Sequence, residues 1–220
     1  MQVTFDDVRN SPEIRTYITQ ADASLIALGF TEHSFAHVTR CAQVAADILT
    51  KLGYSSREVE LAQIAAFMHD IGNVINRVDH AQSGAVMAFR ILDNMGMEPS
   101  EVATVITAIG NHDEHTAFPV NAVAAALILA DKTDVRQSRV RNREPINFDI
   151  HDRVNYAVER SEVLLCPEEQ TITLSLSINT QVCAVMDYFE IFLQRMLLCR
   201  KAAEFFNLAF RLEINDQMLL

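Results

Sequence analysis

The signals that start and stop helices in the first 144 residues constrain the fold of this chain most. Ser11 followed by Pro12 is typical of a helix start, and Ser55 with Glu58 three residues later matches a capping box. Apolar residues recur at helical spacing between these starts and the glycines that follow. Together the signals predict helices over residues 11–29, 31–53, 55–72, 80–96, 98–115 and 118–135.

The periodicity changes near Pro145. Residues 152–166 and 170–179 are rich in β-branched side chains, and a short turn sequence, PEEQ, separates them, which predicts a hairpin. Residues 180–206 form one long amphipathic pattern, and residues 207–215 alternate again. We therefore expect a mainly α protein: a helical bundle domain over 1–144, then an α+β extension over 145–220. The extension would hold a three-stranded antiparallel sheet packed on one long helix.

Composition limits the classes of function. The 220 residues are 50% hydrophobic, enough for a sizeable core, and the formal net charge of −11 argues against general nucleic-acid binding. No apolar run is long enough to span a membrane, and the N-terminus does not resemble a signal peptide. The four cysteines form no C-x-x-C pair. We expect a soluble cytoplasmic protein with no membrane partner, in which the extension could form a homodimer.

Histidines concentrate in the helical part. Six of the seven lie there, near helix ends: His33, His37, His69, His80, His112 and His115. Imidazole is a common metal ligand, and a carboxylate can bridge two ions with its two oxygens. His69 and Asp70 are adjacent at a predicted helix end, where a loosened backbone could aim both side chains at one point. The alternative for this dipeptide is an ordinary aspartate beside a solvated histidine.

The order of these residues resembles a known family. His37 precedes the pair His69–Asp70, and then come His80, His112 and Asp131, each in a helical context, over about residues 33 to 136. This pattern resembles the HD superfamily of metal-dependent phosphohydrolases, in the version with two metal ions. The resemblance implies that the chain binds two divalent ions, with Mn, Fe, Mg, Zn, Co or Ni as candidates.

The resemblance also implies how the ligands divide. His37, His69, Asp70 and Asp131 would hold one ion, and Asp70 would bridge to a second ion held by His80 and His112. One feature departs from some members, the cyclic-di-GMP phosphodiesterases of the HD-GYP group, which have two adjacent histidines where this chain has the sequence HDE. Asp113 stands in the second place and no GYP follows, which argues against a cyclic-di-GMP hydrolase.

Basic residues follow the last predicted ligand. If the helix persists past Asp131, a cationic stripe runs along one face and could guide an anionic substrate: Lys132, Arg136, Arg139 and Arg143. The alternatives are a solvated face or contact with an acidic patch of a partner subunit. Lys132 and Arg136 are favoured because they lie nearest the metals.

Three further residues of the helical part have open roles. Arg40, three residues after His37, could grip a phosphate with both guanidinium branches or form a surface ion pair. His115 could be a ligand, a proton donor to the leaving oxygen or a surface residue. His33 could support His37 or be exposed. His151 lies outside the cluster, and we assign it no role.

Taken together, the resemblance implies hydrolysis of a small phosphate mono- or diester, with nucleotides among the candidates, by a hydroxide held between two metals. Asp70 and Lys132 would be the catalytic residues, and Arg40, His115, Lys132, Arg136 and Arg139 would contact the substrate. One alternative is a di-iron oxygenase, since a few relatives use a similar ligand set. The other is a non-catalytic sensor or scaffold, against which the complete ligand set argues.

Overall fold

The computed structural model describes residues 2–114, 116–141 and 150–219, and it is mainly α. The helical part contains α1 (Phe5–Asn10), α2 (Pro12–Ala27), α3 (Phe35–Lys51), α4 (Ser56–Met68), the 3-10 helix η1 (Ile71–Val74), α5 (His80–Asn94), α6 (Pro99–Gly110), α7 (Ala122–Lys132) and the 3-10 helix η2 (Gln137–Arg139). It is followed by α8 (Ile150–Ala157), β1 (Val158–Cys166), β2 (Thr171–Ile178), α9 (Val185–Phe205), β3 (Ala209–Ile214) and β4 (Gln217–Met218). No helix among these residues has the length and apolar character needed to cross a membrane.

Two predicted helix starts are confirmed by their caps, whereas α3 begins at Phe35 and α7 at Ala122, each four residues later than predicted, and α1 was not predicted. Ser11 caps α2 by accepting a hydrogen bond from the Ile14 amide, and Pro12 is the first helical residue. Ser55 and Glu58 form both hydrogen bonds of a capping box at the start of α4. These local bonds satisfy backbone amides that a helix leaves without partners, so short sequence signals fix where the helices begin.

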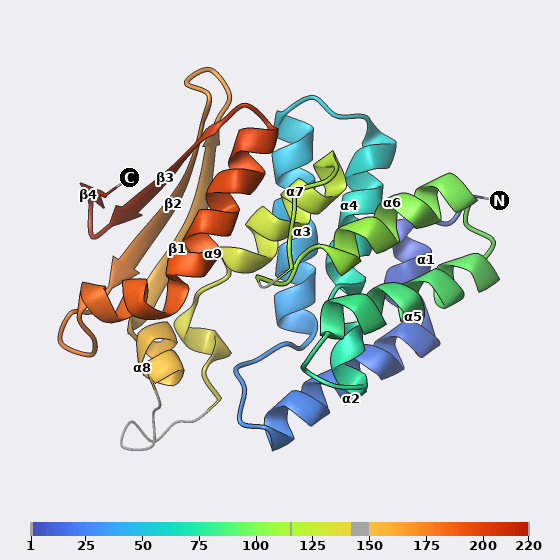
Figure 1. Ribbon diagram of the computed structural model, residues 1–220, viewed down its shortest axis with the longest axis horizontal. Coiled ribbons are helices and arrows are strands. Elements are labelled where there is room, and N and C mark those ends of the chain that lie inside the picture. The colour runs from blue at the N-terminus through green and yellow to red at the C-terminus, as the bar shows by residue number, and fades with distance from the viewer. Residues whose placement is uncertain (1, 115, 142–149, 220) are drawn as a thin grey trace.

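Helix α7 is the centre of the helical part. Every residue from Val123 to Lys132 is buried, because α3, α4 and α6 pack around it and α9 packs against it as well. Figure 1 shows α9 between the sheet and the helical part of the molecule. The single apolar cluster runs without interruption from α1 to β3. The division of the chain into domains at residue 144 stays a prediction.

The sheet differs from the predicted one. Its order is β1-β2-β3-β4, and the hairpin of β1 and β2 is antiparallel as expected, but β3 runs parallel to β2. The reason is the connection: α9 carries the chain back along the sheet, so β3 starts at the same end as β2. A fourth strand follows a two-residue turn in which Asn215 and Asp216 both have positive φ, as a tight hairpin turn requires.

Two other predicted segments are wrong at their ends. The first strand does not include residues 152–157, which belong to α8, and it begins at Val158. Helix α7 ends at Lys132 and does not continue through the basic residues. Arg136 is extended, and Gln137–Arg139 form a separate 3-10 turn. The cationic stripe therefore does not exist as one face of a helix, and Arg143 lies outside the described residues.

Candidate metal centre

The pair His69 and Asp70 lies where α4 ends. The helix stops at Met68, His69 is its cap residue, and Asp70 has φ −96° and ψ 1°, outside the helical range. This break lets both neighbouring side chains face the same point, with His69 Nε2 at 3.2 Å from Asp70 Oδ2. In a regular helix they would point about 100° apart.

Gly72 brings α5 against this break, and it does not end α4 as predicted. A Cβ on Gly72 would lie 2.0 Å from the backbone oxygen of His80 and 2.5 Å from the backbone nitrogen of Gly84. Gly84 in turn lies close to the backbone of His69. The absence of two side chains lets η1 and the first turn of α5 touch through their backbones, which places His80 beside Asp70.

The first group of donors surrounds His37 and His69. His37 Nε2 lies 3.3 Å from Asp131 Oδ1 and 3.7 Å from Asp70 Oδ2. His69 Nε2 lies 3.7 Å from the same oxygen of Asp131. One donor atom each from His37, His69 and Asp70 lies within 4.8 Å of the others. The structure thus brings together the four side chains predicted for one metal ion.

The second group uses the other oxygen of Asp70. His80 Nε2 lies 3.5 Å from Asp70 Oδ1 and 3.2 Å from His112 Nε2. The donor atoms of these three residues also lie within 4.8 Å of one another, as do those of His69, His112 and Asp131. The trios overlap, so the six side chains form one continuous cluster in which Asp70 contacts both groups.

The histidines are oriented by their Nδ1 atoms. In three of them Nδ1 donates to a backbone oxygen. His69 donates to Ala66 at 2.7 Å, His80 to Arg77 at 3.0 Å, and His112 to Ile109 at 2.6 Å. His37 Nδ1 instead lies 2.7 Å from Asp134 Oδ2. A donor on Nδ1 leaves the lone pair of the neutral ring on Nε2, the atom that faces the cluster, and this is how metal-binding histidines are usually held.

The electrostatics of the cluster fit a cation. All six side chains are buried, and within the described part of the chain His69 Nε2 and Asp70 Oδ2 make no hydrogen bond. Burial alone would lower the pKa of His69, but the negative Asp70 and Asp131 raise it to about 10. Burial lowers the pKa of His80 and His112, which keeps them neutral. Two buried carboxylates beside four imidazoles are a donor set suited to divalent metals, and a bound cation would replace the proton that the carboxylates hold on His69.

Two residues that sequence reasoning missed support the cluster. Asp134 is buried and accepts from His37 Nδ1, and Asn73 donates from Nδ2 to Asp70 Oδ1 at 2.9 Å. The spacing of Asp134, three residues after Asp131, was a usable signal because it permits contact from the same helix end. Asn73 gave no signal, since its position depends on the 3-10 turn η1.

Asp134 also pairs with two arginines that the sequence analysis predicted to bind substrate. Arg40 Nε lies 3.2 Å from Asp134 Oδ1, and its Nη2 donates to the backbone oxygen of Ser161 at 2.8 Å. Arg136 Nε lies 2.6 Å from the same carboxylate oxygen. Neither side chain lines the cavity described below, and a substrate contact of these two arginines stays a prediction.

Lys132 is buried behind Asp131. Its Nζ lies 2.7 Å from Asp131 Oδ2 and 3.5 Å from Glu114 Oε1, and Glu114 Oε1 lies 2.6 Å from Arg195 Nε on α9. Burial would raise the pKa of Glu114, but Lys132 and Arg195 hold it at about 2. This chain of charges joins the cluster to the C-terminal part. It places Lys132 against a predicted ligand and not in the cavity.

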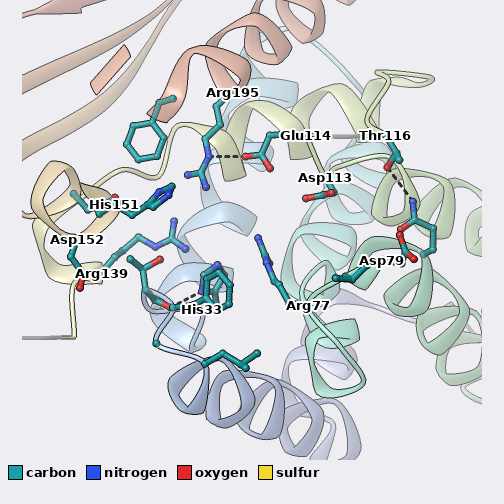
Figure 2. A pocket seen from close by; sticks show the side chains of 18 residues that line it. His33, Arg77, Asp79, Asp113, Glu114, Thr116, Arg139, His151, Asp152 and Arg195 are labelled. Carbon is teal, nitrogen blue, oxygen red and sulfur yellow. Dashed lines mark hydrogen bonds and ion pairs between the residues drawn. The ribbon is translucent and has the colours of Figure 1, made fainter. Parts of the chain in front are cut away.

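A cavity of about 550 Å³ opens beside the cluster (Figure 2). Its wall includes two of the residues considered from sequence, His33 and Arg139, together with Arg77. Arg77 Nη1 lies 3.4 Å from His80 Nε2 and 4.0 Å from Asp70 Oδ1, so this side chain connects the cavity wall to the cluster, whose six side chains do not themselves line the cavity. His151, to which we assigned no role, also lines it. His115 lies outside the described residues.

Comparison with known proteins agrees with this site. The family model of the HD domain matches residues 34–137, the segment that carries all six clustered side chains. A crystal structure of a predicted HD superfamily hydrolase from an uncultured Thermotogales bacterium is 31% identical, over 56% of this chain and 67% of that one, with a TM-score of 0.46. An uncharacterized protein of Methanocaldococcus jannaschii is 24% identical in an alignment 187 residues long that covers 74% of this chain and 71% of that protein. By this family match, the chain belongs to the HD-domain superfamily.

Proposed function

We propose that this protein is a phosphohydrolase that cleaves a phosphate mono- or diester of a small molecule at a pair of divalent metal ions. The observation that carries the proposal is the position of Asp70, whose two oxygens face two separate groups of histidines. His37, His69 and Asp131 would hold one ion with Asp70, and His80 and His112 would hold the other. Bound divalent ions supply Lewis acidity, which polarises a phosphoryl oxygen and acidifies water.

The residues of the chain would do the rest. Burial would raise the pKa of Asp70, but His69 and His33 hold it well below its usual range, so Asp70 stays ionised as a ligand must. Arg77 lies next to Asp70 and faces the cavity, where its guanidinium can hold phosphoryl oxygens through two hydrogen bonds. Lys132 contacts Asp131 and not the cavity, which favours a positioning role in place of the catalytic role expected for it.

Phosphate release tests the proposal. The purified protein, loaded with Mn²⁺, should release phosphate from at least one member of a panel of sugar phosphates, nucleotides and aryl phosphates. Asp70→Ala should remove this activity, while Asp93→Ala, an exposed aspartate at the end of α5, should keep it. Oxygen uptake with an organic substrate, without phosphate release, would instead identify an oxygenase and contradict the proposal.

A further inference from the structure

We infer that the C-terminal part of the chain builds a second anion-binding subsite in the cavity, centred on Arg195 with Arg139 and His151. The substrate would then carry a second anionic group besides the phosphoryl group at the metal centre. This inference rests on the proposed function, because it assumes that the first anion binds beside Asp70 and Arg77. It gives the α+β extension a role in choosing the substrate.

The extension forms one wall of the cavity. His151 and Asn155 come from α8, and Phe192 and Arg195 come from α9. Figure 2 shows the side chains of Arg195, His151 and Arg139 pointing toward one another into the cavity, on the side away from Asp79, Asp113 and Thr116. Residues 81 to 125 positions after Asp70 therefore line the cavity together with residues of the HD domain.

Arg195 is held in one orientation. Its Nε pairs with Glu114, and its guanidinium lies over the ring of Phe192, with Cζ 4.7 Å from the ring centroid. Among the described residues its two Nη nitrogens have no hydrogen-bond partner, so they remain for a ligand. A guanidinium fixed on one edge and by its face loses little freedom when it binds an anion.

Arg139 adds a second fixed charge. Its Nε donates to the backbone oxygen of Glu32 at 3.0 Å, and its Nη1 donates to the backbone oxygen of Asp134 at 2.7 Å. The nearest carboxylate, Asp134, lies 3.9 Å away and is already shared with Arg40 and Arg136. Arg136 also lies 3.7 Å from Glu32, so two carboxylates face the three guanidinium groups, and one positive charge remains in excess on this side of the cavity.

The carboxylates of the cavity are divided between its two sides. On the side of the subsite, Glu114 is shared between Lys132 and Arg195, and Asp152 follows His151 in α8. Asp79 and Asp113 line the opposite side. In a chain of net charge −11, a fixed cluster of positive charge at a cavity of about 550 Å³ is suited to an anion. A cavity of this size also holds more than one phosphate group.

Binding of phosphonates that the enzyme cannot hydrolyse tests the inference. Calorimetry on the Mn²⁺-loaded full chain would compare alkyl monophosphonates with α,ω-bisphosphonates whose spacers run from three to six carbons. For at least one spacer, the bisphosphonate should bind at least about tenfold more tightly than the monophosphonate of equal length, since a charged hydrogen bond contributes on that order. A parallel series of ω-phosphonocarboxylates shows whether the second anion is a phosphate or a carboxylate.

The test compares the dissociation constant of the monophosphonate with that of the bisphosphonate. Arg195→Met should reduce this ratio to about twofold or less, because methionine fills similar space without charge. The control is Arg200→Met, on the same helix, which removes an exposed arginine that pairs with Glu204. It should keep the wild-type ratio. Metal content, measured on each protein, shows whether the cluster is intact.

Each outcome decides between the two claims. If no phosphonate binds to the loaded protein, the proposed phosphohydrolase function fails. If the monophosphonate binds but no bisphosphonate binds more tightly, the second subsite is wrong and the function stands. A ratio unchanged in Arg195→Met also overturns the subsite. The subsite is also wrong if Arg195→Met binds both phosphonates more weakly and has lost bound metal. Arg195 would then act on the cluster through Glu114.

Discussion

Asp134 shows how one side chain can serve both the metal centre and the fold. Its Oδ2 accepts from His37 Nδ1, while its Oδ1 pairs with Arg40 and Arg136. Burial would raise the pKa of Asp134, but His37 and the arginines hold it far below its usual range, so it is ionised at neutral pH. An ionised acceptor fixes the His37 ring and makes its Nε2 a better metal ligand.

Asp134→Asn should therefore lower the affinity for divalent metal by about ten- to a hundredfold, the usual effect of removing such a partner. Competition with a chelator that reports free metal measures this affinity. The matched control is Glu101→Gln, which removes a carboxylate paired with Arg57 far from the cluster. It should leave metal affinity at the wild-type value. Equal affinity in Asp134→Asn would contradict the role of Asp134.

At this scale the sequence predicted which side chains gather but not how each is supported. The order of His37, His69, Asp70, His80, His112 and Asp131 follows from helix ends that face one place. The fates of Arg40 and Arg136 could not be read in the same way. Both depend on Asp134, and its position depends on α7 ending at Lys132 and the chain turning back, for which no glycine or proline gives a signal.

Among the elements, the contact between η1 and α5 decides whether the second group of donors forms. Gly72→Ala would place a Cβ 2.0 Å from the backbone oxygen of His80, so the two elements must separate. We expect a loss of about 1–3 kcal/mol or more in the free energy of unfolding, measured by urea denaturation. We also expect weaker metal binding, because His80 moves with α5.

Gly110→Ala is the matched control on a neighbouring helix. Its Cβ would meet only the Cβ of Ala85, at 3.6 Å, which is ordinary contact. The substitution should be neutral, or stabilising by up to about 1 kcal/mol, since alanine has less freedom to lose in a helix. If both substitutions had the same small effect, the close approach at Gly72 would not hold the site together.

The sequence predicted which segments form strands better than it predicted how those strands pair. The alternation of Ile172, Leu174 and Leu176 identified β2, and these residues are buried as the pattern indicates. Local sequence carries less information about strand direction, and here the parallel pairing of β2 with β3 follows from the return of the chain through α9. That connection is long enough to return the chain to the end of the sheet where β2 starts, which a hairpin turn cannot do.

For the whole molecule, α9 joins the two parts of the chain. It packs on α7 and on β3, so the helical part and the sheet share one core. We predict that the metal-free protein unfolds in one cooperative transition by calorimetry, despite the division at residue 144 that the sequence suggests. Two separated transitions would show that the parts fold independently.

Two methionines of α9 sharpen this prediction. Met196 is buried and Met186 is 75% exposed, so the same substitution can be compared on one helix. Met196→Ala should cost about 2–5 kcal/mol and move the single transition to lower temperature without splitting it. Met186→Ala should leave the transition temperature nearly unchanged.

The central claim is that six side chains, carried on or just after α3, α4, α5, α6 and α7, hold two divalent ions around Asp70. The direct measurement is elemental analysis of the full chain after it is reloaded with Mn²⁺ and freed of unbound metal. We predict two ions per chain for the wild type and a loss of bound metal in Asp70→Ala. A wild-type chain that retains no metal, or an Asp70→Ala chain that retains two ions, would contradict the account.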